Sequence, residues 1–311
     1  MSTVVDKSFQ SAPKIGSRHA VFAVLLATSV ALAWKPLTAL VALCLHGDSY
    51  SHILLIPFIF LYLIYAERAA IFLQVRCSIL PGLAVMLLGV AICWFVNPHF
   101  YRSNGEEHLS AVILGLVVIW LGAFVVCYGL RAARSALFPW LFLLLMVPLP
   151  DAILSRVIGG LQRGSVEISL LLFKICGVPV LRQGVILSVP GVTIEVAKEC
   201  SSIRSSMALF ITCLLAARFY LRTFWKQTLF VVLSLPLSVV KNGIRITTLT
   251  LLSLYVNPGF LHGDLHRDGG FVFFFLALAI LWPVLEALRS SESPAASRAH
   301  EIQTDSQPIR G

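Results

Sequence analysis

The stretch from Leu109 to Tyr128, LSAVILGLVVIWLGAFVVCY, decides the class of fold to which this chain belongs. It runs without a charged side chain over the ~20 residues that an α-helix needs to cross the hydrocarbon core of a bilayer. Polar and apolar positions do not alternate along it, so it predicts a helix rather than a strand of a membrane barrel. The stretch therefore predicts a transmembrane helix.

The remainder of the chain repeats this pattern. Of its 311 residues, 58% are apolar and 13% are charged, and the mean hydropathy is +0.88. Soluble domains have a much more polar composition. We predict an all-α polytopic membrane protein with about eight transmembrane helices. The predicted spans are residues 20–34, 53–66, 80–96, 109–128, 136–147, 203–217, 229–254 and 270–288.

These spans define the predicted domains. Residues 1–19 form a cytoplasmic N-terminal segment and residues 20–289 form one multispanning membrane domain. Residues 290–311 form a cytoplasmic tail without apolar periodicity, which we expect to be disordered. The first apolar segment has the basic flank of a signal peptide, but the many later spans favour an uncleaved helix.

Basic residues alternate between connections, and this alternation predicts the orientation. Lys and Arg gather in cytoplasmic loops, so the basic connections are placed inside the cell, and the net charge of +9 is chiefly an anchoring signal. No basic stretch is interleaved with aromatic residues, so we expect no nucleic-acid partner. The loops predicted to lie outside are residues 46–52, 97–108, 148–199 and 257–269.

The outside stretch 148–199 has structure of its own. Residues Asp151 to Cys176 mix apolar and charged positions, which suits a helix lying in the membrane interface, while a tilted or re-entrant helix stays open. The sequence VILSV-PG-VTIEV that follows predicts a small β-hairpin, because Pro190-Gly191 is a typical turn pair. This extracytoplasmic hairpin delivers the chain to Cys200.

Cys200 is the first candidate for chemistry. It lies just before a predicted transmembrane helix, whose positive end and free N–H groups favour a thiolate and can hold an oxyanion. Lys198 and Arg204 are close to it in sequence. The structural alternative is that Ser201 and Ser202 only cap the helix and that the cysteine has no role.

Two further polar intrusions lie near the same membrane face. KNGIRI, residues 241–246, interrupts an apolar run; we expect Lys241 to reach the headgroups by snorkelling and Arg245 to face a protein interior or a wet cavity. The loop HGDLHRDGG, residues 262–270, precedes the last span, and a histidine there can move protons near neutral pH. A rival interpretation makes His262, Asp264, His266 and Asp268 metal ligands, but no HExxH is present and we expect no metal and no cofactor.

Three ordered motifs resemble those of the exosortase/archaeosortase family of membrane cysteine transpeptidases. They are ECSSIR at 199–204, NGIRI at 242–246 and HRDGG at 266–270, and the likeness extends over residues 20–288. The resemblance implies that Cys200 is the nucleophile, Arg245 the motif arginine and His266 the imidazole, with Arg204, Asn242 and Ser201 in supporting or substrate-binding positions. Ser202 stands where the family usually has glycine, and Phe271 where tryptophan is common.

The same resemblance implies an activity. The family cleaves C-terminal sorting signals of secreted proteins at the outer face of the cytoplasmic membrane through a Cys thioester, and transfers the new carboxyl end to an acceptor. The expected partners are therefore secreted proteins with such a signal, together with membrane lipid. No sequence pattern indicates an oligomeric state.

Two functions of other classes stay open from the sequence. In a small-solute transporter, Lys241 and Arg245 would line a polar path, although the two halves of the chain show no repeat of the kind that transporters often have. In a metal-dependent membrane protease, His262 and His266 would hold the metal. Survival of solute uptake in Cys200→Ala would favour the first, and loss of activity in EDTA the second.

Overall fold

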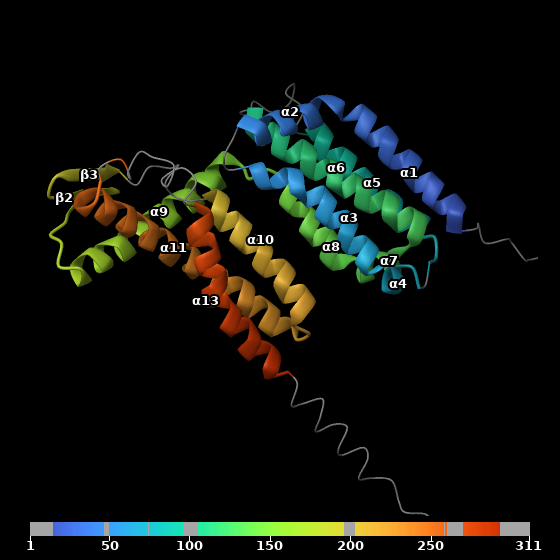
Figure 1. Ribbon diagram of the computed structural model, residues 1–311. Helices are drawn as coiled ribbons and strands as arrows, with labels where there is room; N and C mark the ends of the chain where they lie inside the picture. The colour runs from blue at the N-terminus through green and yellow to red at the C-terminus, as the bar shows by residue number, and fades with distance from the viewer. Residues whose placement is uncertain are drawn as a thin grey trace, which may run out of the picture. The chain divides into compact units, whose positions relative to one another are not determined.

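The computed structural model describes residues 15–46, 50–73, 75–95, 105–195, 203–257, 259 and 270–292 of the chain. It divides the chain into two compact units, residues 1–151 and 152–311 (Figure 1). Both units are built mainly from helices, and the described residues contain one small three-stranded sheet. The predicted class, an all-α polytopic membrane protein, is confirmed.

The first unit is entirely helical in its described part. The helix α6 (Gly105–Tyr128) contains the uncharged stretch from Leu109 to Tyr128, and it pairs with α5 (Ile79–Phe95). The other elements are α1 (Ile15–Leu32), α2 (Trp34–His46), η1 (Ser51–Leu55), α3 (Ile56–Ala66), α4 (Arg68–Ile71), α7 (Leu130–Ser135), α8 (Leu137–Leu143) and η2 (Leu144–Met146).

Glycines determine how closely α5 and α6 approach. A Cβ added at Gly89 would lie 2.7 Å from the carbonyl oxygen of Gly115, and one at Gly82 would lie 2.9 Å from that of Gly122. Gly82 and Gly89 are seven residues apart on α5, as are Gly115 and Gly122 on α6, so each pair lies on one face of its helix. Helices in lipid associate mainly through such close backbone packing, since burial from lipid adds little.

The second unit contains three long helices and the segment that precedes them. The helices are α10 (Ile203–Tyr220), α11 (Phe224–Tyr255) and α13 (Gly270–Ser290), and the preceding segment holds α9 (Asp151–Ile175), β1 (Leu181–Gln183), β2 (Ile186–Val189) and β3 (Val192–Glu195). The predicted hairpin corresponds to β2 and β3, which pair antiparallel with Val189 opposite Val192. The strand β1, which pairs with β2, was not predicted.

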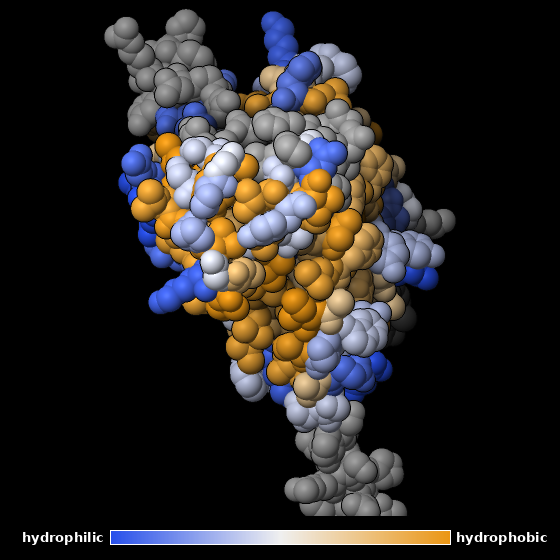
Figure 2. All heavy atoms as spheres, turned by 60° about the vertical axis from the view of Figure 1, so that its left-hand side comes forward, coloured by the Kyte–Doolittle hydropathy of each residue, from blue (hydrophilic) through white to orange (hydrophobic). Residues whose placement is uncertain are grey.

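Apolar side chains join α10, α11 and α13 into one core. Leu209, Cys213 and Ala217 of α10 pack with Phe230 of α11 and Ala277 of α13, and all five are nearly inaccessible. The opposite side chains of α13 face outward and are hydrophobic. The face of the protein shown in Figure 2 carries hydrophobic side chains over its middle and hydrophilic ones at its lower end, where α13 stops.

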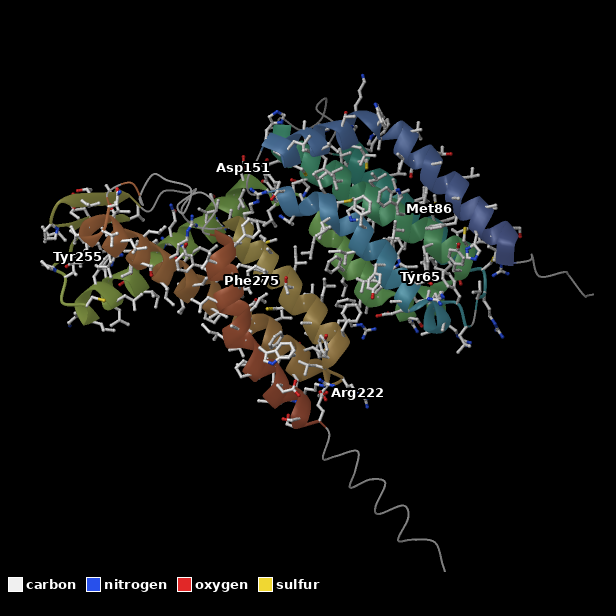
Figure 3. The ribbon with its side chains drawn as sticks, in the orientation of Figure 1. Tyr65, Met86, Asp151, Arg222, Tyr255 and Phe275 are labelled. Carbon is white, nitrogen blue, oxygen red and sulfur yellow. The ribbon has the colours of Figure 1, made fainter. Side chains whose placement is uncertain are left out.

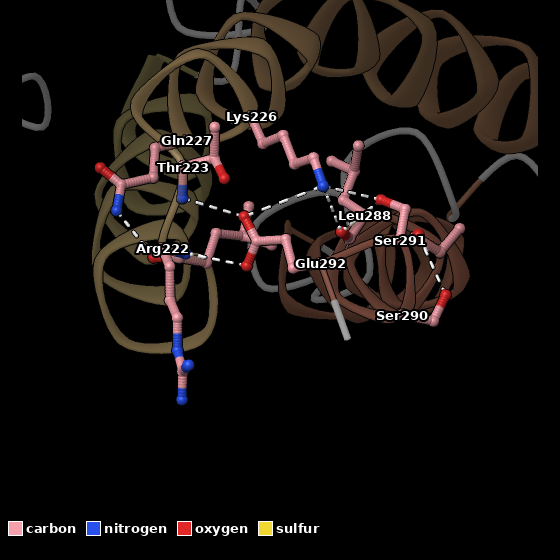
Figure 4. Close-up of polar contacts among 10 residues, drawn as sticks. Arg222, Thr223, Lys226, Gln227, Leu288, Ser290, Ser291 and Glu292 are labelled. Atoms are coloured by element: carbon pink, nitrogen blue, oxygen red, sulfur yellow. Dashed lines mark hydrogen bonds and ion pairs between the residues drawn. The ribbon is translucent and has the colours of Figure 1, made fainter. Parts of the chain in front are cut away.

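A single carboxylate ties the ends of these helices together (Figure 4). Glu292, just after α13, accepts hydrogen bonds from the backbone N–H groups of Arg222, at 3.0 Å, and Thr223, at 2.9 Å. Lys226 lies 3.9 Å from the same carboxylate and donates to Ser291 Oγ at 2.9 Å. We call these five residues the carboxylate latch. It supplies a negative charge to the N-terminus of α11, where the helix dipole favours one.

Four helices in the described part of the chain are long and apolar enough to cross a membrane, or up to six if each bent helix pair counts as one span. The four are residues 107–128, 203–220, 224–255 and 270–290. Each of the eight predicted spans overlaps a helix, but the count of eight crossings is not confirmed and stays a prediction. The single-domain boundaries 20–289 likewise stay a prediction.

Candidate active site

The motif NGIRI lies in the second half of α11 and faces α9. Asn242 is 1% exposed, and its Nδ2 donates to Ser165 Oγ at 2.9 Å. One residue further, the carbonyl of Gly243 accepts a hydrogen bond from Ser169 Oγ at 3.3 Å. Ser165 Oγ in turn donates a hydrogen bond to the carbonyl oxygen of Leu161 at 2.7 Å, so the Asn242 contact is one link of a chain of hydrogen bonds. These contacts hold α11 against α9 at the motif.

Position 243 must be a glycine because the contact with α9 leaves no room for a side chain. A Cβ added there would lie 2.5 Å from Ile168 Cγ2 and 2.7 Å from Ile168 Cβ. Non-bonded carbon atoms pack about 3.5–4.0 Å apart. Gly164 meets Val239 in a similar way, at 2.7 Å. Glycines therefore let α9 and α11 approach closely where the motif begins.

Lys241 corrects one expectation from the sequence. It is 2% exposed, so it does not snorkel to the headgroups, and its Nζ donates to Ser205 Oγ at 2.6 Å. Ser205 belongs to the first turn of α10, next to exposed Arg204. The hydrogen bond therefore joins the middle of α11 to the N-terminus of α10. Arg245 is half-buried and lies one turn beyond Lys241, on the same side of α11.

The position along α11 agrees with a site near one membrane boundary. Lys241 follows the first residue of α11 by a helical rise of about 25 Å, close to the ~30 Å thickness of a hydrocarbon core. Beyond it, α11 continues to Tyr255 and carries several threonines, with Thr247 and Thr250 buried. The second half of α11 thus extends past the length that a bilayer requires.

The β-sheet packs against this second half. Leu187 and Val189 of β2 share a core with Ile246 of α11 and Phe173 of α9. The last strand, β3, ends at Glu195, five residues before Cys200.

The three long helices give the site its topology. The carboxylate latch joins the C-terminal ends of α10 and α13, and the two helices share one core. They therefore run parallel to each other. The helix α11, which lies between them in the sequence, runs antiparallel to both. Figure 3 marks the two directions: Arg222 labels the latch end, whereas Tyr255 labels the far end of α11. The N-termini of α10 and α13 therefore lie at the end opposite the latch.

Three of the six predicted site residues fall on described helices. They are Arg204 at the start of α10, and Asn242 and Arg245 on α11. Cys200, Ser201 and His266 lie outside the described residues.

Three serines contribute to this region without a motif in the sequence. Ser165 and Ser169 were missed because isolated serines in a helix of mixed apolar and polar residues form no motif. The one signal for a helix contact is that the pairs Gly164-Ser165 and Ile168-Ser169 are four residues apart, which places them on one face. Ser205 was missed in the same way, because it follows the motif ECSSIR without belonging to it.

The described residues contain no group of three or more His, Cys, Asp or Glu side chains that could hold a metal ion. The rival metal ligands, residues 262–268, lie outside the described part of the chain. The six described cysteines are free thiols, and those at positions 77 and 176 are exposed.

The family model described as transmembrane exosortase matches residues 44–283, which is more than half of the chain and includes all three motifs. The chain belongs to the transmembrane exosortase family. Comparison of the sequence with curated proteins and with solved structures gives no significant match. At the level of the family, the activity of this exosortase is that of a membrane cysteine transpeptidase.

Proposed function

We propose that this exosortase cleaves C-terminal sorting signals of secreted proteins at the outer face of the cytoplasmic membrane, with Cys200, Arg245 and His266 as its reacting groups. The observation that carries the proposal is the helix topology. Parallel α10 and α13 start at the end opposite the latch, and α11 brings its polar half to Ser205 at that same end through Lys241.

The chemistry follows from the three side chains. The Cys200 thiolate attacks the scissile carbonyl, and the C–N bond then breaks as His266 gives a proton to the leaving amine. The remaining acyl group is a thioester on Cys200. The acceptor nucleophile opens this thioester and gives its proton to the neutral imidazole of His266, and Cys200 leaves as a thiolate. The guanidinium of Arg245 stabilises the negative oxygen that develops in each step.

The position of the site suits a substrate anchored in the membrane. A sorting signal with its own transmembrane helix presents its scissile bond at the headgroup level, and the start of α10 lies at one boundary of the bundle. Docking of the substrate helix from within the membrane would then hold the scissile bond in a fixed orientation at the site, instead of leaving it to a free encounter in solution. Basic loops place the latch end inside, so the opposite end faces outward.

The experiment is a comparison of Cys200→Ala with Cys176→Ala, a second cysteine close in sequence that is exposed and has no role in the proposal. In cells that secrete a substrate, Cys200→Ala should stop processing, while Cys176→Ala should process normally. Mass spectrometry should detect a substrate thioester on the wild-type chain and on Cys176→Ala, and none on Cys200→Ala. Full processing by Cys200→Ala would end the proposal.

The two other roles have matched variants. Arg245→Lys should be strongly impaired, because an ammonium does not present the planar fork of a guanidinium; normal turnover would make Arg245 an anchor only. His266→Ala should abolish turnover, while His262→Ala in the same loop should not.

A further inference from the structure

The helix α9 presents three different faces, and only one of them is covered by its own unit. Val166 and Phe173 are fully buried against the sheet and α11. Ser165 and Ser169 make the hydrogen bonds to α11 described above. This face fixes α9 to the unit, and it leaves the other two turned outward.

The second face is a cationic stripe. Arg156, Arg163, Glu167 and Lys174 are all exposed, and their spacing of seven, four and seven residues places them in one row along the helix. Glu167 is neutralised by Arg182, whose Nη1 lies 2.6 Å from its carboxylate. In the described part of the chain no acidic group pairs with the three cations of α9. The stripe therefore carries about three uncompensated positive charges.

The third face is an apolar stripe next to the cations. Ile153, Val157, Leu171 and Ile175 are exposed by 49%, 43%, 54% and 71%. On a helical wheel they lie about 60–100° from the cationic stripe. A surface with aliphatic side chains on one side and cations on the other is typical of a helix that rests in the membrane interface.

The orientation of α9 follows from its contact with α11. The hydrogen bonds and glycine contacts between them involve residues 164–169 of α9 and 239–243 of α11, and the two helices cross there (Figure 1). The crossing point lies a helical rise of about 22–28 Å from the start of α11, near one boundary of the hydrocarbon core. If α9 also crossed the core, Arg163 at its centre would be exposed to lipid, which is strongly unfavourable.

We propose that α9 lies in the membrane interface, with its apolar stripe among the acyl chains and Arg156, Arg163 and Lys174 bound to the phosphates of anionic phospholipids in that leaflet. Charge complementarity selects this occupant. A second copy of the chain would set three cations against three cations, whereas an anionic leaflet gains from each of them. The inference is independent of the catalytic role of Cys200.

Cysteine labelling tests the orientation. In a variant whose Cys77, Cys176 and Cys200 are replaced by serine, single cysteines are introduced as Arg156→Cys, Lys174→Cys or Leu171→Cys. A membrane-impermeant maleimide should label the first two from the same side of the membrane, and the third at least fivefold more slowly. Labelling of Arg156→Cys and Lys174→Cys from opposite sides would overturn the proposal, because α9 would then span.

Lipid retention tests the partner. The full chain is purified in detergent from membranes that contain phosphatidylglycerol and phosphatidylcholine, and the retained lipids are quantified. The triple variant R156Q/R163Q/K174Q should lower the ratio of retained phosphatidylglycerol to phosphatidylcholine by about fivefold or more, since each cation near an anionic surface contributes about that factor. The matched control is Glu167→Gln on the same stripe, which should leave that ratio unchanged or raise it.

Two outcomes would contradict the assignment of the lipid. An unchanged ratio in both the triple variant and the single variant Arg163→Gln would remove the anionic phospholipid. Disulfide cross-linking between two copies of Leu171→Cys at full yield would instead assign the apolar stripe to a second copy of the chain.

Discussion

Replacing Gly243 by alanine should destabilise the second unit by pushing α11 away from α9. The added Cβ would meet Ile168 at 2.5 and 2.7 Å and the carbonyl oxygen of Ser165 at 3.3 Å. Relief requires the helices to separate by about 1 Å to reach normal carbon contact distances. That movement also stretches the Asn242–Ser165 hydrogen bond of 2.9 Å.

The magnitude follows from three terms. Overpacking of a tight contact costs about 1–3 kcal/mol. A stretched buried hydrogen bond adds about 1 kcal/mol, and the higher helix propensity of alanine returns about 1 kcal/mol. We therefore expect Gly243→Ala to lower the free energy of unfolding by about 2 kcal/mol. SDS titration of the protein in mixed micelles measures this difference.

The same substitution elsewhere on the pair provides the control. Gly160 of α9 is exposed, and a Cβ added there has nothing within 4 Å. Gly160→Ala should therefore be neutral or stabilise by up to about 1 kcal/mol. The two variants differ only in what the new methyl group meets.

A double mutant isolates the contact. Ile168→Ala removes the side chain that the new methyl group would strike, so the double variant Ile168→Ala/Gly243→Ala should be more stable than the sum of the single effects by at least about 1 kcal/mol. Additive effects, or a Gly243→Ala variant as stable as the wild type, would refute the close-packing argument. The glycine of the motif would then need an explanation in substrate binding.

Three further predictions concern polar contacts between helices. Lys241→Met should separate the start of α10 from α11 and reduce processing at least tenfold, whereas Lys241→Arg, which keeps a donor for Ser205, should retain more activity. Asn242→Leu should destabilise by about 2 kcal/mol in the same titration, because Ser165 loses its buried donor and the leucine must fit a filled contact. Burial raises the pKa of Glu292, but the backbone hydrogen bonds and nearby Lys226 outweigh it and lower the pKa overall. The latch should thus stabilise fully above the ordinary glutamate pKa and weaken as pH falls through the lowered value; Glu292→Gln should lose about 1 kcal/mol at pH 7, and the gap to wild type should close in acid.

The sequence predicted local elements well where their signal is local. Each predicted span overlaps a helix, and the turn pair Pro190-Gly191 joins two antiparallel strands as expected. The helix α2 and the strand β1 were missed. The first continues the apolar composition of α1 after a bend of 74°, and hydropathy alone does not reveal a bend. The second has only three residues, all exposed.

The hydrogen-bond partners of side chains were harder to predict than the helices and strands. Lys241 was expected to snorkel, because a lysine near the end of an apolar run usually finds the headgroups. Its acceptor is a serine 36 residues earlier in the chain. No local pattern connects the two positions, so only the packed helices reveal the contact.

By itself, the sequence determined that this chain is a helical membrane protein and which motifs it carries, because both properties are set by side-chain composition over short windows. Tertiary structure alone decided that α10 and α13 run parallel toward the latch, that α9 crosses α11 at Gly243, and that Lys241 joins α11 to α10. These facts depend on contacts between residues tens of positions apart. Such contacts arise from shape and hydrogen bonding between packed surfaces, which a linear pattern does not encode.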